Sequence, residues 1–271
     1  GFGMTMTGGC GNKALVRLGA GNLKSLIVVI FIGIFAYMTL RGLTGLARVE
    51  LEEILNINLE ARGIDDQGLP TFLGFFGLSD LAARLISIAV ITLGLFWFVF
   101  KSAEFRASKA NLTGGIIIGL LIPAAWYVTG VIGSDDFEPT PLASFSFVAP
   151  VGESIQYLMT FTGSTINFGI AVVAGVIAGS FLAAKSSGEF KIEAFTDSND
   201  MVRHIIGASI MGFGGVLALG CTVGQGITGI STLAVGSFLA LFSIFLGGYY
   251  GLKYMEEGPL SGALAAVFGR D

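Results

Sequence analysis

Two ten-residue stretches decide the fold, GFGMTMTGGC at residues 1–10 and GFGGVLALGC at residues 212–221. Each has Gly-Phe-Gly, five further residues and then Gly-Cys. The cysteines that end them, Cys10 and Cys221, are the only two cysteines in the 271-residue chain. Matching glycines alone would carry little weight in a chain with 41 of them. A duplicated, glycine-flanked thiol in apolar sequence predicts two related halves that present sulfur to a shared site.

The composition around these motifs is that of a membrane protein. Hydrophobic residues make up 53% of the chain and charged residues 13%, about half the charge of an ordinary soluble domain. Five apolar runs approach or reach the ~20 residues that a helix needs to cross a bilayer. They are Leu23–Leu40, Ala82–Phe100, Leu112–Gly133, Ile166–Ala184 and Leu233–Leu252. The sequence therefore predicts an all-α, multi-span protein embedded in the lipid bilayer.

The distribution of charge predicts the orientation of the two motifs. Lys101, Arg106 and Lys109 share one short loop, whereas residues 134–148 contain acids and no Lys or Arg. By the positive-inside bias, the first loop is cytoplasmic and the second periplasmic. Residues 1–22 then run from outside to inside, and residues 203–230 run the opposite way.

Opposite orientation is what an inverted-topology repeat requires. We expect a single transmembrane domain over residues 1–271, with a first half at 1–133 and a second half at 150–271. The helix predicted at 166–184 precedes the second motif but has no counterpart before the first. We therefore expect that roughly 50 residues of the first half are absent from this sequence.

Glycines crowd both cysteines, as in Gly8-Gly9-Cys10-Gly11. Each glycine inside a helix costs about 1 kcal/mol relative to alanine, so a continuous helix is unfavourable there. We expect broken or re-entrant helices around both cysteines, in places where protein or a watery cavity satisfies the freed backbone groups. Close helix packing through small residues is the alternative explanation for the same glycines.

Two further segments have a predicted place in this topology. Residues 48–80 carry seven acids, which predicts a solvated periplasmic insertion with an amphipathic helix on the membrane interface. Residues 150–163 are short and moderately apolar, which predicts a re-entrant half-helix with Pro150 in its first turn.

The motif regions GFGMTMTGGCGNKALVRLGAGN and MGFGGVLALGCTVGQGITGISTLAVGSFLA resemble the two signature stretches of the YeeE/YedE sulfur-transport family. The sequence between them is similar too, so the resemblance covers essentially the whole chain. It implies uptake of thiosulfate or a related inorganic sulfur anion across the bacterial inner (cytoplasmic) membrane. It also implies that cysteine thiols relay the anion by S–H···S hydrogen bonds, and that a cytoplasmic sulfurtransferase is a partner.

By motif, Cys10 and Cys221 match two of the relay cysteines of the family. A further family cysteine, upstream of the first motif, is absent from this sequence, and Gln225 stands where many members have histidine. Glutamine donates and accepts hydrogen bonds but cannot titrate. The candidate substrate-binding residues are Cys10, Cys221, Gly9, Gly220, Thr222 and Gln225.

The physical chemistry of the pattern suits an anion. A thiol is a weak donor and soft acceptor, matched to the terminal sulfur of thiosulfate, and half-helix N-termini supply partial positive charge. Moving a dianion against an inside-negative potential of 100 mV costs roughly 5 kcal/mol. Glu153 is the only candidate acid in the predicted membrane cores. We therefore expect facilitated passage that intracellular consumption pulls forward.

Two other functions are open for the same cysteines. A membrane thiol–disulfide oxidoreductase would need Cα atoms within about 7 Å and would normally use a Cys-x-x-Cys pair or a quinone site. A structural subunit would use the cysteines only for packing. The single histidine and scattered acids predict no metal site, and no strand precedes the glycines at 19–21, which excludes nucleotide binding there. We expect no enzyme activity, no cofactor and no nucleic-acid partner.

Two basic residues and the histidine have predicted places as well. Lys13 and Arg17 would share a helix face just inside from Cys10, as a positive-inside anchor or as an anion attractor at the exit. We expect His204 to lie at the membrane interface rather than to act in catalysis.

Overall fold

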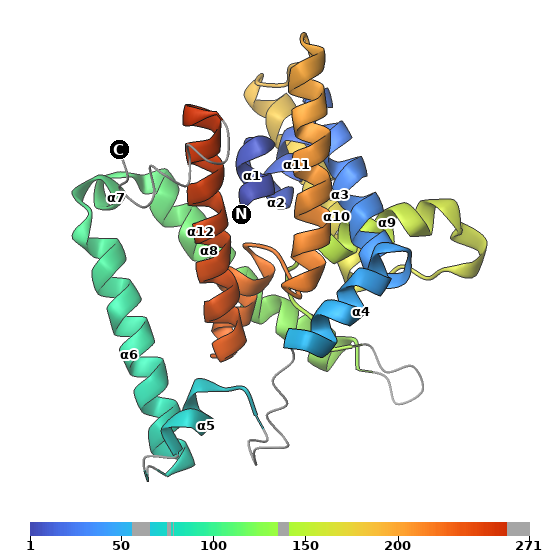
Figure 1. Cartoon of the computed structure of the whole chain (residues 1–271). Coiled ribbons are helices and arrows are strands. Elements are labelled where there is room, and N and C mark those ends of the chain that lie inside the picture. The colour runs from blue at the N-terminus through green and yellow to red at the C-terminus, as the bar shows by residue number, and fades with distance from the viewer. Residues whose placement is uncertain (56–65, 75–76, 78, 135–140, 259–271) are drawn as a thin grey trace. The chain divides into compact units, whose positions relative to one another are not determined.

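The computed structural model describes residues 1–55, 66–74, 77, 79–134 and 141–258. Over these ranges the chain is helical, with two isolated β-bridges and no strands (Figure 1). Five helices are long and apolar enough to cross a membrane. They are α3 (Leu23–Arg41), α6 (Asp80–Lys101), α8 (Lys109–Tyr127) with its π-helical extension η2 (Val128–Ile132), α10 (Phe168–Ser187) and α12 (Val235–Glu257). Each coincides with a predicted span, so the prediction of an all-α, multi-span membrane protein is confirmed.

The other helices connect or interrupt these spans. They are α1 (Phe2–Met6), α2 (Gly11–Gly19), α4 (Thr44–Leu55), α5 (Leu69–Gly74), α7 (Ala103–Ala107), α9 (Val148–Met159), the 3-10 turn η3 (Phe161–Gly163), α11 (Ser198–Leu217) and the π-helix η4 (Gly224–Gly229). The helix predicted after residue 150 is confirmed, with Pro150 in the first turn of α9. Its re-entrant placement stays a prediction. Residues 56–65 of the predicted insertion lie outside the described residues.

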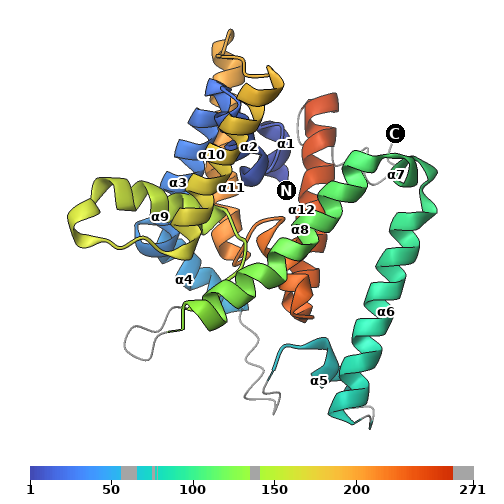
Figure 2. The same ribbon diagram turned by 180° about the vertical axis from the view of Figure 1, so that it is seen from behind.

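The chain divides into two compact units, residues 1–56, 146–226 and 239–271 in the first, and residues 57–145 and 227–238 in the second. In the first unit α3 is the central helix and packs against α2, α4, α9 and α11, an arrangement that can be followed from both sides (Figure 2). Val28, Ile32 and Ala36 form its buried face. These positions are four residues apart, so they lie on one side of the helix.

Glycines let the helices of the first unit approach closely. A Cβ atom added at Gly212 of α11 would lie 2.6 Å from the Ile32 carbonyl oxygen of α3, and one added at Gly3 of α1 would collide with the Gly207 carbonyl of α11. Close packing through small residues therefore explains these glycines. The glycines beside the cysteines have another role, described below.

The second unit is a helical array of α5 to α8. Ser102 and Ser108 cap α7 and α8, because their hydroxyls accept the N–H groups of Phe105 and Asn111, each at 3.3 Å. These caps produce the sharp turns in the basic loop that joins the spans α6 and α8. The apolar side chains of α6 are largely exposed in the isolated chain, Trp97 to 68%. Such exposure is what a lipid-facing helix requires.

Candidate functional site

Each Gly-Cys motif interrupts a helix, as predicted. In the first motif α1 ends at Met6 and α2 begins at Gly11. In the second motif α11 ends at Leu217 and η4 begins at Gly224. The glycines beside the cysteines therefore belong to breaks between helical segments.

The two breaks have the same backbone hydrogen bonds. In each, three consecutive N–H groups donate to carbonyls four, three and five residues earlier in the chain. The first set is Thr7 to Gly3, Gly8 to Thr5 and Gly9 to Met4; the second is Ala218 to Gly214, Leu219 to Val216 and Gly220 to Gly215. Gly8 and Leu219 both have positive φ, at +70° and +54°. The same pattern of backbone hydrogen bonds, with one residue of positive φ, therefore ends both α1 and α11.

Both cysteines stand where the next helical segment begins. The Cys10 carbonyl accepts the Ala14 N–H at 3.0 Å, and the Cys221 carbonyl accepts the Gln225 N–H at 2.7 Å. The Gly224 N–H also donates to the Cys221 Sγ at 3.4 Å. The first N–H groups of a helix lack intrahelical partners, and they carry the positive end of the helix dipole. Each thiol is therefore next to partial positive charge.

Cys10 and Cys221 line the same cavity of about 470 Å³, within the first unit. The polar groups of its lining include both thiols and the hydroxyls of Thr222 and Ser243. The rest of the lining is mainly glycine and apolar side chains, and no Asp, Glu, Lys or Arg is among the described residues around it. Both cysteines are free thiols, Cys221 buried and Cys10 partly buried. The cavity suits a small ligand that the thiols contact directly.

Four of the six predicted site residues line this cavity, namely Cys10, Cys221, Gly220 and Thr222. Gln225 instead donates its side-chain amide to the Ala218 carbonyl at 2.7 Å, a bond that spans the second break. Gly9 accepts a hydrogen bond from the Thr7 hydroxyl at 3.0 Å and lines a smaller, separate cavity.

Sequence reasoning missed Ser243 of α12 and Val148 of α9, which both line the large cavity. Ser243 is a polar residue inside an apolar run, which can indicate a binding site. The same pattern also occurs where a serine only packs against a neighbouring helix, so it is not specific. Its hydroxyl donates to the Leu239 carbonyl within the same helix at 2.8 Å. Only the packing of α12 and α9 around the breaks places these residues at the cavity.

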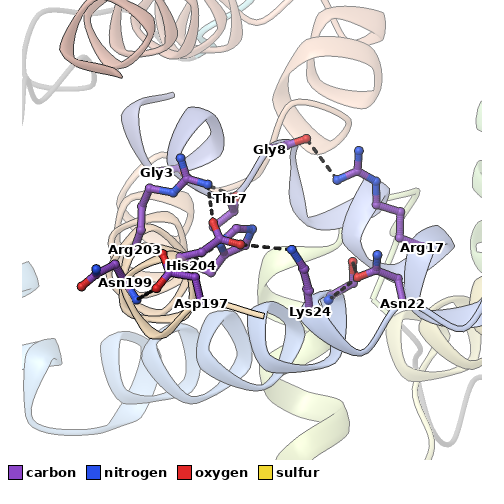
Figure 3. A network of polar contacts seen from close by, with 12 residues as sticks. Gly3, Thr7, Gly8, Arg17, Asn22, Lys24, Asp197, Asn199, Arg203 and His204 are labelled. Carbon is purple, nitrogen blue, oxygen red and sulfur yellow. Dashed lines mark hydrogen bonds and ion pairs between the residues drawn. The ribbon is translucent and has the colours of Figure 1, made fainter. Parts of the chain in front are cut away.

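A cluster of charged side chains lies beside the first break, at the small cavity that Gly9 lines. Lys24 of α3 pairs with Asp200 of α11 at 3.1 Å, and Arg203 contacts the same carboxylate (Figure 3). The Nδ1 atom of buried His204 donates to the Asp200 carbonyl at 2.7 Å. Burial raises the pKa of Asp200, but the hydrogen bonds from Lys24 and Arg203 and the nearby charge of His204 outweigh it. The pKa of Asp200 therefore lies below its usual 3.8.

Arg17 and Lys13 have different surroundings. Arg17 donates from Nη1 to the Gly8 carbonyl at 3.3 Å, across the turn that precedes Cys10 (Figure 3). The exposed Lys13 side chain lies against Gly9 and lines neither cavity. No group of three or more His, Cys, Asp or Glu side chains fit to hold a metal ion occurs among the described residues.

Comparison with known proteins relates the chain to sulfur transport. A family model described as "Sulphur transport" matches residues 1–250. The chain is 26% identical over 253 residues to the thiosulfate transporter TsuA of Spirochaeta thermophila, an alignment that covers 92% of this chain and 73% of that protein. It is 27% identical to the thiosulfate transporter TsuA of Escherichia coli, over 91% of this chain and 69% of that protein. The chain belongs to the sulphur-transport family, as the resemblance of its two cysteine motifs implies.

Proposed function

We propose that this protein carries thiosulfate or a related inorganic sulfur anion inward across the bacterial inner membrane, through the cavity lined by Cys10 and Cys221. The observation that carries the proposal is that the only two cysteines of the chain, 211 residues apart, line one cavity. The relatives support it as well, because both are named thiosulfate transporters. That name describes transport rather than catalysis.

The chemistry of the cavity supports a sulfur anion. A thiol donates and accepts only weak hydrogen bonds, and its polarisable sulfur matches the terminal sulfur of thiosulfate. The N–H groups that begin α2 and η4 add partial positive charge, and the hydroxyl of Thr222 adds a stronger donor. Since no cationic side chain is in the described lining, no ion pair with a side chain holds the anion in place. Weak, sequential contacts of this kind let a substrate leave as readily as it enters.

The matched breaks support an inverted repeat with halves at residues 1–133 and 150–271. Equal hydrogen bonding around Cys10 and Cys221 supports their equivalence in the two proposed halves. Their opposite orientation follows from the positive-inside prediction. Two antiparallel broken helices would then present one thiol each to the same path, from opposite sides of the membrane.

The path favours facilitated passage over coupled pumping. Glu153, the one acid predicted in a membrane core, accepts a hydrogen bond from the Asn167 amide at 2.7 Å and does not line the cysteine cavity. Consumption of the anion inside the cell would then drive its uptake. A cytoplasmic sulfurtransferase that receives the anion remains a prediction of the family resemblance.

Uptake of labelled thiosulfate by cells or proteoliposomes tests the proposal. Cys10→Ala and Cys221→Ala should abolish uptake while each variant stays folded in the membrane at the wild-type amount. Uptake that survives both substitutions would overturn the proposal. Mass spectrometry under non-reducing conditions separates the thiol–disulfide oxidoreductase, because a hydrogen-bond relay leaves both thiols free during turnover.

A further inference from the structure

A second, smaller cavity lies beside the first break. Its volume is about 40 Å³, and its polar lining comes from Thr7, Arg17, Asn22, Lys24, Ser25 and His204. Every lining residue belongs to the first unit, in the turn before Cys10, in α2, α3 and α11, or, for Asn22, at the N-cap of α3. The turn at residues 7–10 contributes to both cavities, since Thr7 and Gly9 line the small one and Cys10 lines the large one.

The described side chains that line the small cavity include two cations, Arg17 and Lys24, and no acid. The nearest acid, Asp200, pairs with Lys24 and also with Arg203. A second acid nearby, Glu193, accepts the amide of Asn22 at 2.7 Å.

Three basic side chains, Arg17, Lys24 and Arg203, lie in or beside the small cavity. Among the described residues, Asp200 is the one carboxylate that they contact. Within the described part of the chain, the only hydrogen-bond partner of the Arg17 guanidinium is the neutral Gly8 carbonyl. The Nε of Arg203 is buried and has no hydrogen-bond partner among the described residues. Arg203 pairs with Asp200 and does not line the cavity, so Arg17 is the lining cation whose remaining N–H groups can donate to an anion there.

We propose that this small cavity is a second anion site, which binds a tetrahedral oxyanion such as sulfate or the oxyanion end of thiosulfate. Arg17 and Lys24 would donate charge-assisted hydrogen bonds to its oxygens. The volume is about three times what one buried water needs, enough for an anion of a few heavy atoms. In the predicted orientation, the site lies on the cytoplasmic side of Cys10. Its role as an exit station rests on the proposed function; oxyanion binding itself does not.

The two cavities should differ in what they recognise. The large cavity presents thiols and so selects the terminal sulfur of thiosulfate. The small cavity has no thiol in its described lining and recognises charge and shape alone. Sulfate and thiosulfate should therefore bind to it with similar affinity.

Asp200 is the internal competitor of the anion. Its carboxylate takes one hydrogen bond from Lys24, and that bond must weaken when Lys24 turns to a bound oxyanion. Loss of the Asp200 charge should therefore tighten anion binding, whereas loss of the Arg17 or Lys24 charge should weaken it. Changes of opposite sign cannot both come from a general loss of folding.

Sulfate binding to the purified full chain at low ionic strength, measured by equilibrium dialysis or calorimetry, tests the site. The protein background is Cys10→Ala/Cys221→Ala, which leaves the small cavity intact. Arg17→Gln and Lys24→Gln should each weaken binding by about tenfold or more, and Asp200→Asn should tighten it. Lys185→Gln is the matched control, because Lys185 is an exposed cation at the end of α10 that lines neither cavity; it should leave the affinity unchanged.

The site is refuted if Arg17→Gln and Lys24→Gln bind sulfate as the background does, or if the background binds no sulfate in the millimolar range. Thiosulfate uptake by the wild-type chain separates the two proposals. If uptake depends on the cysteines but sulfate binding does not depend on Arg17, only the proposal of the small site is refuted. If sulfate binding depends on Arg17 but the chain takes up no thiosulfate, only the proposed transport function is refuted.

Discussion

Gly8 and Leu219 occupy the same position in the two cysteine motifs and both adopt a left-handed backbone, with φ of +70° and +54°. Their N–H groups donate to the carbonyl three residues earlier in each case. Glycine adopts this conformation without strain, whereas leucine has a Cβ atom that clashes with the backbone there. The second break is therefore strained, and its conformation is held by surrounding bonds such as that from Gln225 to Ala218.

Replacement of Leu219 should relieve this strain. The Leu219 side chain is 80% exposed, so its loss removes little packing. We expect Leu219→Gly to stabilise the folded protein by about 1 kcal/mol, as measured by unfolding in detergent. Gly8→Ala should destabilise it by a similar amount, and Leu219→Ala should give no relief because alanine keeps the Cβ atom. A Leu219→Gly protein less stable than wild type would contradict this interpretation.

The amide of Gln225 should matter as a donor to the second break. Gln225→Glu keeps the shape but replaces the donor with a carboxylate facing the Ala218 carbonyl. We expect a loss of roughly 1–3 kcal/mol in unfolding free energy and reduced thiosulfate uptake. Thr222→Val, which leaves this bond in place, is the comparison for a change in the cavity lining alone. Wild-type stability in Gln225→Glu would show that the bond does not hold the break.

The Asp200 cluster predicts a specific pH dependence. Because the pKa of Asp200 is lowered in the folded state, its charge contributes stability above its usual pKa of 3.8. That contribution is lost as the pH falls below this value and the carboxylate is protonated. Asp200→Asn should therefore unfold at a lower temperature than wild type at neutral pH, and the gap should close as the pH falls below 3.8. A gap that stays constant down to the acid limit would argue against this role.

A side chain added at Gly214 should block the large cavity. Gly214 lines it, and a Cβ atom there would meet no other atom within 4 Å. We expect Gly214→Leu to fold normally and to lose most thiosulfate uptake. Gly175→Leu on α10 is a matched control, because its Cβ atom also meets nothing and it lies outside the cavity. Equal uptake in the two variants would place the path elsewhere.

Local sequence signals predicted much of this structure. The apolar runs predicted the five spans, and the glycines around the cysteines predicted both helix breaks. Both signals are local, because the length of an apolar run and the density of glycine are properties of one short segment. The equivalence of Gly8 and Leu219 could not be predicted, since leucine at a left-handed position has no sequence signal. The backbone bonds reveal it.

Long-range packing produced what sequence reasoning could not reach. The pair of Lys24 and Asp200 joins residues 176 positions apart, and it forms because α3 packs on α11. The placement of His204 at the membrane interface stays a prediction. The structure gives this histidine a buried place beside Asp200 and an edge-on contact with Phe195. The small cavity follows from the same packing, which no local pattern encodes.

The alkylation rate of the two cysteines, measured by mass spectrometry with and without thiosulfate, tests most directly whether both thiols belong to one anion path. Saturating thiosulfate should slow the modification of Cys10 and Cys221 together, and equal sulfate should protect both far less. Protection of one cysteine alone, or of neither, would contradict a shared path for the sulfur anion.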